Sequence, residues 1–183
     1  MRKLIAAINM TLDGFCDHTA INPDASIHRH YTDLLSNAGT ALYGRITYQL
    51  MEYWRPIVNQ PTGESSMDEF ALAINNIPKI VFSRTLKSVD WKSARLAEQD
   101  IESVVAALKK EKGKDILACS PSLIVALGKL NLIDEYQICV HPLVAGSGLP
   151  LFKNIDKRLE LQLIQTKTFP SGAIIFYYRP ALQ

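Results

Sequence analysis

Short and almost continuous apolar runs recur along the chain, separated by longer segments of mixed character. Apolar and polar residues do not alternate within these runs, which is typical of strands that are buried on both faces. Such strands form parallel sheets whose two sides are covered by helices. The pattern therefore predicts five buried strands, at residues 3–8, 40–43, 79–82, 115–119 and 136–140.

The segments between these runs show helical spacing. Ile101, Val104, Val105 and Leu108 follow the i, i+3, i+4, i+7 pattern of a helix that buries one face. Gly113 comes shortly afterwards and is a typical signal for the end of a helix. A helix is therefore predicted before the fourth apolar run.

A second helix is predicted directly after that run, because Ser120 is placed as an N-cap and Pro121 as the first helical residue. Weaker apolar patterns predict three further helices, at residues 28–37, 45–53 and 67–76.

The last part of the chain has a different character. Residues 159–169 and 173–179 are strand-like, and the turn-forming residues 170–172 lie between them. This pattern predicts a C-terminal hairpin that adds an antiparallel strand to a mostly parallel sheet. We expect a three-layer α/β fold in which residues 1–183 form a single domain.

Composition and charge exclude several classes of function. A net charge of +2 in 183 residues is too small to indicate nucleic-acid binding. The four lysines that end one predicted helix, Lys109, Lys110, Lys112 and Lys114, are expected to form a solvated surface. No run approaches the roughly 20 apolar residues that a membrane span needs. We therefore expect neither a nucleic-acid nor a membrane partner.

The cysteines indicate a reducing compartment. Cys16, Cys119 and Cys139 are odd in number and too far apart in sequence for metal-ligand pairs. We therefore expect no metal and a cytoplasmic location.

Small and cationic residues follow one of the predicted strands. Gly44, Arg45 and Thr47 come after the run 40–43, where a strand leads into a helix. The glycine lets a ligand approach the backbone, the arginine can bind a phosphate with two donors, and the threonine offers a hydroxyl near the helix start. Taken alone, the pair is also compatible with an ordinary turn and a surface charge.

Two other strand ends carry similar residues. Ser83 and Arg84 follow the run 79–82, and Ser120 follows the run 115–119. Ligands of open α/β sheets bind beyond the carboxyl ends of the strands. Two arginines at such an edge need anions nearby, and a phosphorylated dinucleotide supplies several.

Five segments, in this order and spacing, resemble the dihydrofolate reductase superfamily, and more closely its branch related to the C-terminal reductase domain of RibD, the bifunctional riboflavin-biosynthesis enzyme. The segments are KLIAAINMTLDGF, LYGRITY, VFSRTL, LIDEYQICVHPLVAGSGLPLF and SGAIIFYY. The resemblance implies a mixed, mostly parallel sheet and an NADPH site.

The resemblance also assigns cofactor contacts. Arg45, Ser83 and Arg84 would favour NADPH over NADH through the 2′-phosphate, and Thr47 would lie near the pyrophosphate together with Gly44. The backbone of Ala6 and Ala7 would approach the nicotinamide.

The sequence departs from the family pattern after the fourth apolar run. The family usually has a glycine pair where this chain has Cys119 and Ser120, and an acidic residue where it has Ala118. Cys119, Ser120 and Ser122 remain candidate cofactor contacts, although the segment CSPSL is equally compatible with a simple capped helix start. The missing acid leaves a specific pyrimidine substrate open.

The proton donor is a second departure. True dihydrofolate reductases have a carboxylate early in the first helix, and the counterpart here falls near His28. His28, His30 or Asp33 could supply a proton, although each is also compatible with a surface position. Asp13 belongs to a TLDG turn, which the resemblance places at a wall of the active-site cleft.

The leading hypothesis is therefore an NADPH-dependent reductase of a small heterocyclic (pyrimidine- or pterin-like) or carbonyl substrate, with Asp13, His28 and Asp33 as candidate catalytic residues. One alternative is an NADP-binding module without catalysis, and another is an authentic dihydrofolate reductase with a relocated proton donor. We expect a homodimer, with the loop that contains Gly146 and Gly148 and the C-terminal strands as the contact surface.

Overall fold

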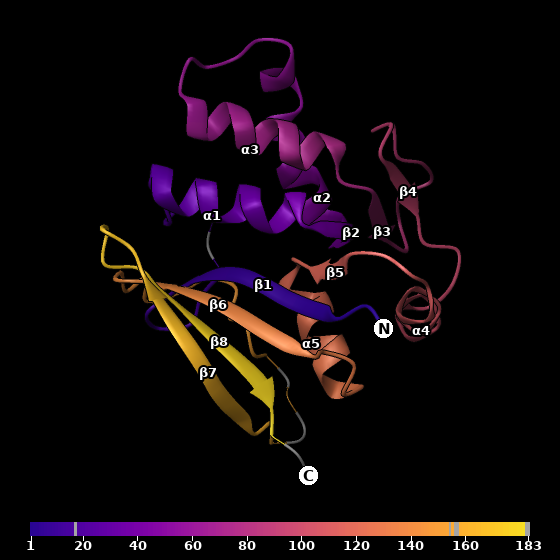
Figure 1. Cartoon of the computed structure of the whole chain (residues 1–183). Coiled ribbons are helices and arrows are strands. Elements are labelled where there is room, and N and C mark those ends of the chain that lie inside the picture. The colour runs from indigo at the N-terminus through magenta and orange to yellow at the C-terminus, as the bar shows by residue number, and fades with distance from the viewer. Residues whose placement is uncertain (17, 154, 156–157, 182–183) are drawn as a thin grey trace.

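The computed structural model describes residues 1–16, 18–153, 155 and 158–181. In these residues eight strands form one sheet, in the order β4-β3-β2-β5-β1-β6-β8-β7 (Figure 1). The strands are β1 (Leu4–Thr11), β2 (Ala38–Gly44), β3 (Lys79–Phe82), β4 (Ala94–Leu96), β5 (Asp115–Ala118), β6 (Glu135–His141), β7 (Leu161–Thr168) and β8 (Ile174–Pro180).

The directions of the strands confirm the predicted fold class. The neighbouring strands from β4 to β6 pair in parallel, whereas β8 is antiparallel to both β6 and β7. β8 is thus the antiparallel strand that the C-terminal hairpin pattern predicts. The sequence analysis missed β4, because this three-residue strand has no apolar run.

Among the described residues, five α-helices cover the two faces of the sheet (Figure 1). They are α1 (Ala25–Ser36), α2 (Arg45–Met51), α3 (Ser65–Asn76), α4 (Ile101–Lys110) and α5 (Pro121–Lys129). α1, α2 and α3 pack on one face, which we call the α1 face, and α4 and α5 pack on the other, the α5 face.

Two helix boundaries differ from the prediction for local reasons. α1 begins three residues early because the Asp24 carboxylate accepts hydrogen bonds from the backbone N–H groups of Ser26 and Ile27, both at 2.9 Å. α2 ends early, at Met51, and continues as two short 3-10 turns, the second of which begins at Pro56.

The core is continuous on the α5 face but divided on the α1 face. One α1-face cluster lies over β2, β3 and β5 and includes Leu35 of α1. The other lies over β6 and β8 and includes Ile27, also of α1, with Tyr31 packed against it. Ala7 of β1 belongs to neither cluster, and Asn9, two residues further on, is polar. The apolar packing under α1 is therefore interrupted along β1.

Candidate functional site at the carboxyl edge of the sheet

The strand register brings three of the predicted segments to one edge of the sheet. Gly44, the last residue of β2, is paired with Phe82, the last residue of β3. β5 ends beside them, because Leu42 is paired with Ala118. The backbone N–H of Gly44 donates a hydrogen bond of 2.8 Å to the Ser120 hydroxyl. We call this edge, from Gly44 to Arg45, Ser83 to Arg84 and Ser120 to Ser122, the rim.

Two helices begin at the rim without a side-chain cap. Gly44 precedes α2 and cannot cap it, and the Ser120 hydroxyl precedes α5 but forms no cap hydrogen bond to it. Ser120 has the predicted N-cap position, yet its oxygen accepts from Gly44 instead. By contrast, α1 and α4 are capped by the carboxylates of Asp24 and Asp100. The N–H groups at the start of α5 therefore remain available to an anion.

The geometry at Gly44 fits the approach of a ligand. A Cβ at this position would meet the Ser122 hydroxyl at 3.5 Å and the Ser120 side chain at 3.7 Å, which are ordinary contacts. The backbone φ of −78° is open to any residue. Neither packing nor backbone conformation thus requires glycine here, so the glycine is compatible with a role in ligand binding.

Both rim arginines are exposed. The Arg45 guanidinium donates to the Gln49 side-chain oxygen at 3.1 Å, and within the described residues no carboxylate pairs with Arg45 or Arg84. The Ser83 hydroxyl accepts from the N–H groups of Thr85 and Leu86, at 3.1 and 2.9 Å, and so holds the turn that carries Arg84. The rim therefore presents two positive charges that the described protein does not neutralise.

The residues toward the centre of the sheet are small or neutral. Ala6 contributes to the core on the α5 face, and Ala7 is buried on the opposite side of β1. Cys119 is half-buried against the cluster over β2, β3 and β5, and burial raises the pKa of its thiol to about 12. Cys119 is thus a neutral side chain where the family usually has glycine. Thr47 is half-buried on the first turn of α2.

The candidate proton donors on α1 do not converge. The His28 ring packs beside Trp54 and Phe70, with ring centroids at 5.8 and 5.6 Å, and burial lowers its pKa. Asp33 is exposed, five residues further along α1. His30 faces β7, where Lys167 is 3.3 Å away, and burial lowers its pKa to about 4.

Asp13 binds backbone rather than another catalytic candidate. Its carboxylate accepts from the N–H groups of Ala145 and Gly146, at 3.1 and 2.7 Å, and from the Thr11 hydroxyl at 2.6 Å. The hydrogen bond from Thr11 is the main cause that lowers the pKa of Asp13. Asp13 therefore ties the loop after β1 to the glycine-containing loop after β6.

The sequence analysis missed a polar group at the ends of β1 and β6. The His141 Nε2 is 2.9 Å from the Asn9 side-chain oxygen and 3.6 Å from the Cys139 sulfur. All three residues lie on the α1 face, in the interruption of the apolar packing or beside it. The signal was present, because Asn9 is a polar residue two positions after Ala7 in an otherwise apolar strand.

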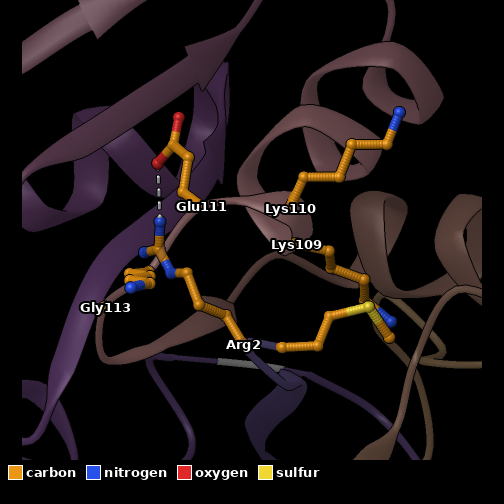
Figure 2. A pocket seen from close by; sticks show the side chains of 7 residues that line it. Arg2, Lys109, Lys110, Glu111 and Gly113 are labelled. Atoms are coloured by element: carbon orange, nitrogen blue, oxygen red, sulfur yellow. Dashed lines mark hydrogen bonds and ion pairs between the residues drawn. The ribbon is translucent and has the colours of Figure 1, made fainter.

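A separate cavity of about 500 Å³ lies at the opposite edge of the sheet, near the amino end of β1 (Figure 2). The buried Arg2 guanidinium donates there to Glu111 at 3.1 Å. Lys109, expected to be a solvated charge, is instead mostly buried and forms an ion pair with Asp134 at 2.6 Å. The cavity contains no rim residue, so it is not part of the candidate site.

Comparison with known proteins decides the family. The model of the RibD C-terminal domain matches residues 2–175. The chain belongs to the RibD C-terminal domain family. It is 34% identical to YyaP of Bacillus subtilis (strain 168), a protein described as uncharacterized, over 97% of this chain and 94% of YyaP. The family is that of the resemblance noted in the sequence.

Two solved structures share the fold. A bifunctional deaminase and 5-amino-6-(5-phosphoribosylamino)uracil reductase from Thermotoga maritima aligns with a TM-score of 0.67 at 14% identity, over 98% of this chain and 57% of that chain. Dihydrofolate reductase from Enterococcus faecalis, solved with NADP(H), aligns with a TM-score of 0.63 at 13% identity, over 97% of this chain and 96% of that chain. The dihydrofolate reductase-like fold is therefore confirmed.

The described residues contain neither a candidate membrane span nor a cluster of metal ligands. None of the helices there is both long and apolar enough to cross a bilayer. No group of three or more His, Cys, Asp or Glu side chains in the same part of the chain could hold a metal ion.

Proposed function

We propose that this protein is an NADPH-dependent reductase that transfers hydride to a small heterocyclic (pyrimidine- or pterin-like) or carbonyl substrate. The observation that carries the proposal is the rim, where two unpaired guanidinium groups flank an uncapped helix start and an unhindered glycine. A dinucleotide with a pyrophosphate and a 2′-phosphate brings the negative charge that such an edge would neutralise. Membership of a reductase-domain family supports the same conclusion.

Each rim residue has a role in this proposal. Arg45 and Arg84 bind the 2′-phosphate, and Ser83 holds the turn that orients Arg84. Thr47 and the N–H groups that follow Pro121 at the start of α5 bind the pyrophosphate. When bound, NADPH supplies the hydride. The protein then contributes placement on the α1 face beside Ala7 and exclusion of water.

A second candidate is an NADP-binding module without catalysis. The observation that favours it is His28, which replaces the expected acid and whose ring packs beside Trp54 and Phe70. Such a protein would bind NADPH at the same rim and consume none. An authentic dihydrofolate reductase is the third candidate, and it requires a proton donor other than the early acid.

The three candidates are separated by two measurements on the wild-type protein. Quenching of tryptophan fluorescence, from Trp54 and Trp91, measures the binding of NADPH and NADH. Loss of nicotinamide absorbance measures turnover of dihydrofolate, a 6-(ribosylamino)uracil and 9,10-phenanthrenequinone. Tighter binding of NADPH with turnover of at least one probe supports the reductase. Binding without turnover supports the binding module, and turnover of dihydrofolate alone supports the folate reductase.

We also propose a homodimer in the cytoplasm. The three cysteines are free thiols, which is compatible with a reducing compartment. Apolar side chains are exposed on β7 and on the loop after β6, at Leu163, Ile164, Val144 and Leu149. A second copy of the chain would remove them from water.

A further inference from the structure

Tyr31 is the residue of α1 that faces the sheet where the apolar packing is interrupted. It packs against the cluster that contains Ile27, one turn earlier, and Cys139 of β6. Its hydroxyl lies within electrostatic range of the thiols of Cys139, Cys119 and Cys16. These thiols come from β6, from the end of β5 and from the loop after β1. The phenol therefore lies near β6, the end of β5 and the loop after β1.

The Tyr31 hydroxyl has no internal partner. Among the described residues nothing hydrogen-bonds to it. The oxygen is also absent from the set of fully buried side-chain atoms without a partner, so it retains some contact with solvent. Buried polar groups in proteins are almost always hydrogen-bonded, so a free hydroxyl at a partly buried position indicates a partner that arrives from solution. The side chain is otherwise held firmly, with the His30 ring in edge contact at 5.4 Å between centroids.

The other candidate donors near this region face different elements. The His28 Nδ1 and the His30 Nε2 are buried and have no hydrogen-bond partner among the described residues. His28 and His30 face α3 and β7, and Asp33 is exposed. His141 is bound to Asn9 at 2.9 Å. Tyr31 differs from these residues because it packs against the cluster over β6 and β8.

Accepting the proposed reductase function, we propose that the Tyr31 hydroxyl contacts the C=O or C=N bond of the substrate and donates the proton that completes its reduction. The carbon of that bond takes up hydride from the dihydronicotinamide, and the π electron pair moves to oxygen or nitrogen. That atom then takes the proton from Tyr31 Oη, and the tyrosinate recovers a proton from water. The substrate thus gains one hydride and one proton.

The surroundings of Tyr31 keep it in the donor state. Burial, together with the Cys139, Cys119 and Cys16 thiols and the Tyr177 phenol, raises its pKa well above the ordinary value of 10. A neutral phenol is therefore present at every physiological pH, whereas burial lowers the pKa of His28 and His30 and so disfavours their protonated, proton-donating form. A neutral phenol of high pKa suits a strongly basic product atom, such as the alkoxide of a reduced carbonyl.

The test compares Tyr31→Phe with Tyr53→Phe, which removes a hydroxyl from an exposed tyrosine outside the site. The probes are dihydrofolate, a 6-(ribosylamino)uracil and 9,10-phenanthrenequinone. For any probe that the wild type reduces, Tyr31→Phe should lower kcat about 100-fold, with KM and the NADPH dissociation constant nearly unchanged. Tyr53→Phe should behave as the wild type. Wild-type kcat should stay level from about pH 6.5 to 9, without the loss that a donor with a near-neutral pKa would give.

Two results would overturn the inference and leave the reductase function standing. One is a Tyr31→Phe variant that binds NADPH and retains kcat. The other is a wild-type kcat that falls as a single proton is lost near neutral pH, because the donor would then be a group with a near-neutral pKa and not the Tyr31 phenol. If the wild type binds NADPH and reduces none of the probes, the reductase function fails and the role of Tyr31 fails with it. Unchanged NADPH binding by Tyr31→Phe also shows that the variant is folded.

Discussion

Arg45 lies at the first position of α2 and makes no charged contact in the described part of the chain. If it binds the 2′-phosphate, Arg45→Ala should weaken the binding of NADPH by about 1.5–3 kcal/mol, or roughly 10- to 150-fold, because a charge-assisted hydrogen bond is lost. NADH has no 2′-phosphate, so its affinity should change little. Fluorescence titration with both cofactors measures the difference.

The matched control for this prediction is Arg95→Ala, which removes an exposed arginine from β4. It should leave both affinities near those of the wild type. Equal weakening of NADPH and NADH by Arg45→Ala would reduce Arg45 to a general phosphate contact and would contradict the assigned preference.

Lys79 is almost fully buried at the start of β3, and burial lowers its pKa to about 7. Its ammonium donates to the Ile77 carbonyl at 2.9 Å and to the Ser93 hydroxyl at 2.8 Å, and lies 4.2 Å from the centre of the Trp91 ring. The unfolded chain holds this proton up to about pH 10.5. Above pH 7 the unfolded state therefore binds more protons than the native state, so Lys79 makes the protein more stable as the pH rises.

Lys79→Met should remove this contribution. From pH 7 to about 8.5 the free energy of unfolding of the wild type should rise relative to that of Lys79→Met, by at most about 1.4 kcal/mol per pH unit. Urea titrations at several pH values measure it, with Lys92→Met as the exposed-lysine control. Parallel pH profiles for the wild type and Lys79→Met would show that Lys79 stays charged in the folded protein.

At the scale of elements, the loop after β1 and the loop after β6 behave as one unit. Leu12 N–H donates to the Leu143 carbonyl at 2.7 Å, and the Asp13 carboxylate accepts from Ala145 and Gly146. The N–H groups of Ala145 and Gly146 donate to different oxygens of the Asp13 carboxylate. Asp13→Asn keeps one of these oxygens and should therefore lose one of the two backbone hydrogen bonds. Amide hydrogen exchange at Ala145 and Gly146 should therefore become faster.

Glu98→Gln serves as the control for this prediction, because it removes one negative charge from an exposed position outside both loops. It should leave exchange in the loops unchanged. If Asp13→Asn exchanges at the wild-type rate, the backbone hydrogen bond between Leu12 and Leu143 is sufficient to hold the loops together.

The apolar pattern along the chain was enough to predict the strands and helices that form the rim. The side-chain contacts on the α1 face could be seen only in the structure. Gly44 and Ser120 could be placed because buried parallel strands read as continuous apolar runs and their ends share one edge. β4 could not, because three residues with mixed burial leave no pattern. His28 was predicted as a candidate donor, but its neighbours Trp54 and Phe70 come from segments that only tertiary packing places around it.

Tyr31 is a candidate residue that the sequence could not single out. An aromatic residue on a helix facing the sheet is ordinary in sequence, and nothing local distinguishes a packed tyrosine from one with a free hydroxyl. The distinction depends on three thiols that are far apart in the chain and on the missing hydrogen-bond partner. Single-domain organisation over residues 1–183 stays a prediction.

For the whole molecule, the proposed cofactor site and the proposed dimer contact lie on different strands of the sheet. The rim lies on β2, β3 and β5, the interrupted packing on β1 and β6, and the antiparallel β8 with edge strand β7 on the far side (Figure 1). Cofactor binding and contact with another chain can thus occupy different parts of one sheet. A substitution on β7 should change assembly without changing the affinity for NADPH.

The proposed homodimer can be tested on that edge. β7 pairs only with β8 among the described strands, and Ile164 is about half exposed. An exposed apolar edge strand is a surface that pairs readily with another chain. Sedimentation of the wild type should give about twice the chain mass of 20.4 kDa, and Ile164→Asp should give the monomer.

Leu72→Asp is the control for the dimer, because Leu72 is equally exposed but lies on α3. It should stay dimeric. Both variants should bind NADPH as the wild type does, because neither residue belongs to the rim. A monomeric wild type would exclude the homodimer. An Ile164→Asp variant that stays dimeric would move the interface away from β7, toward the loop after β6 where Val144 is exposed.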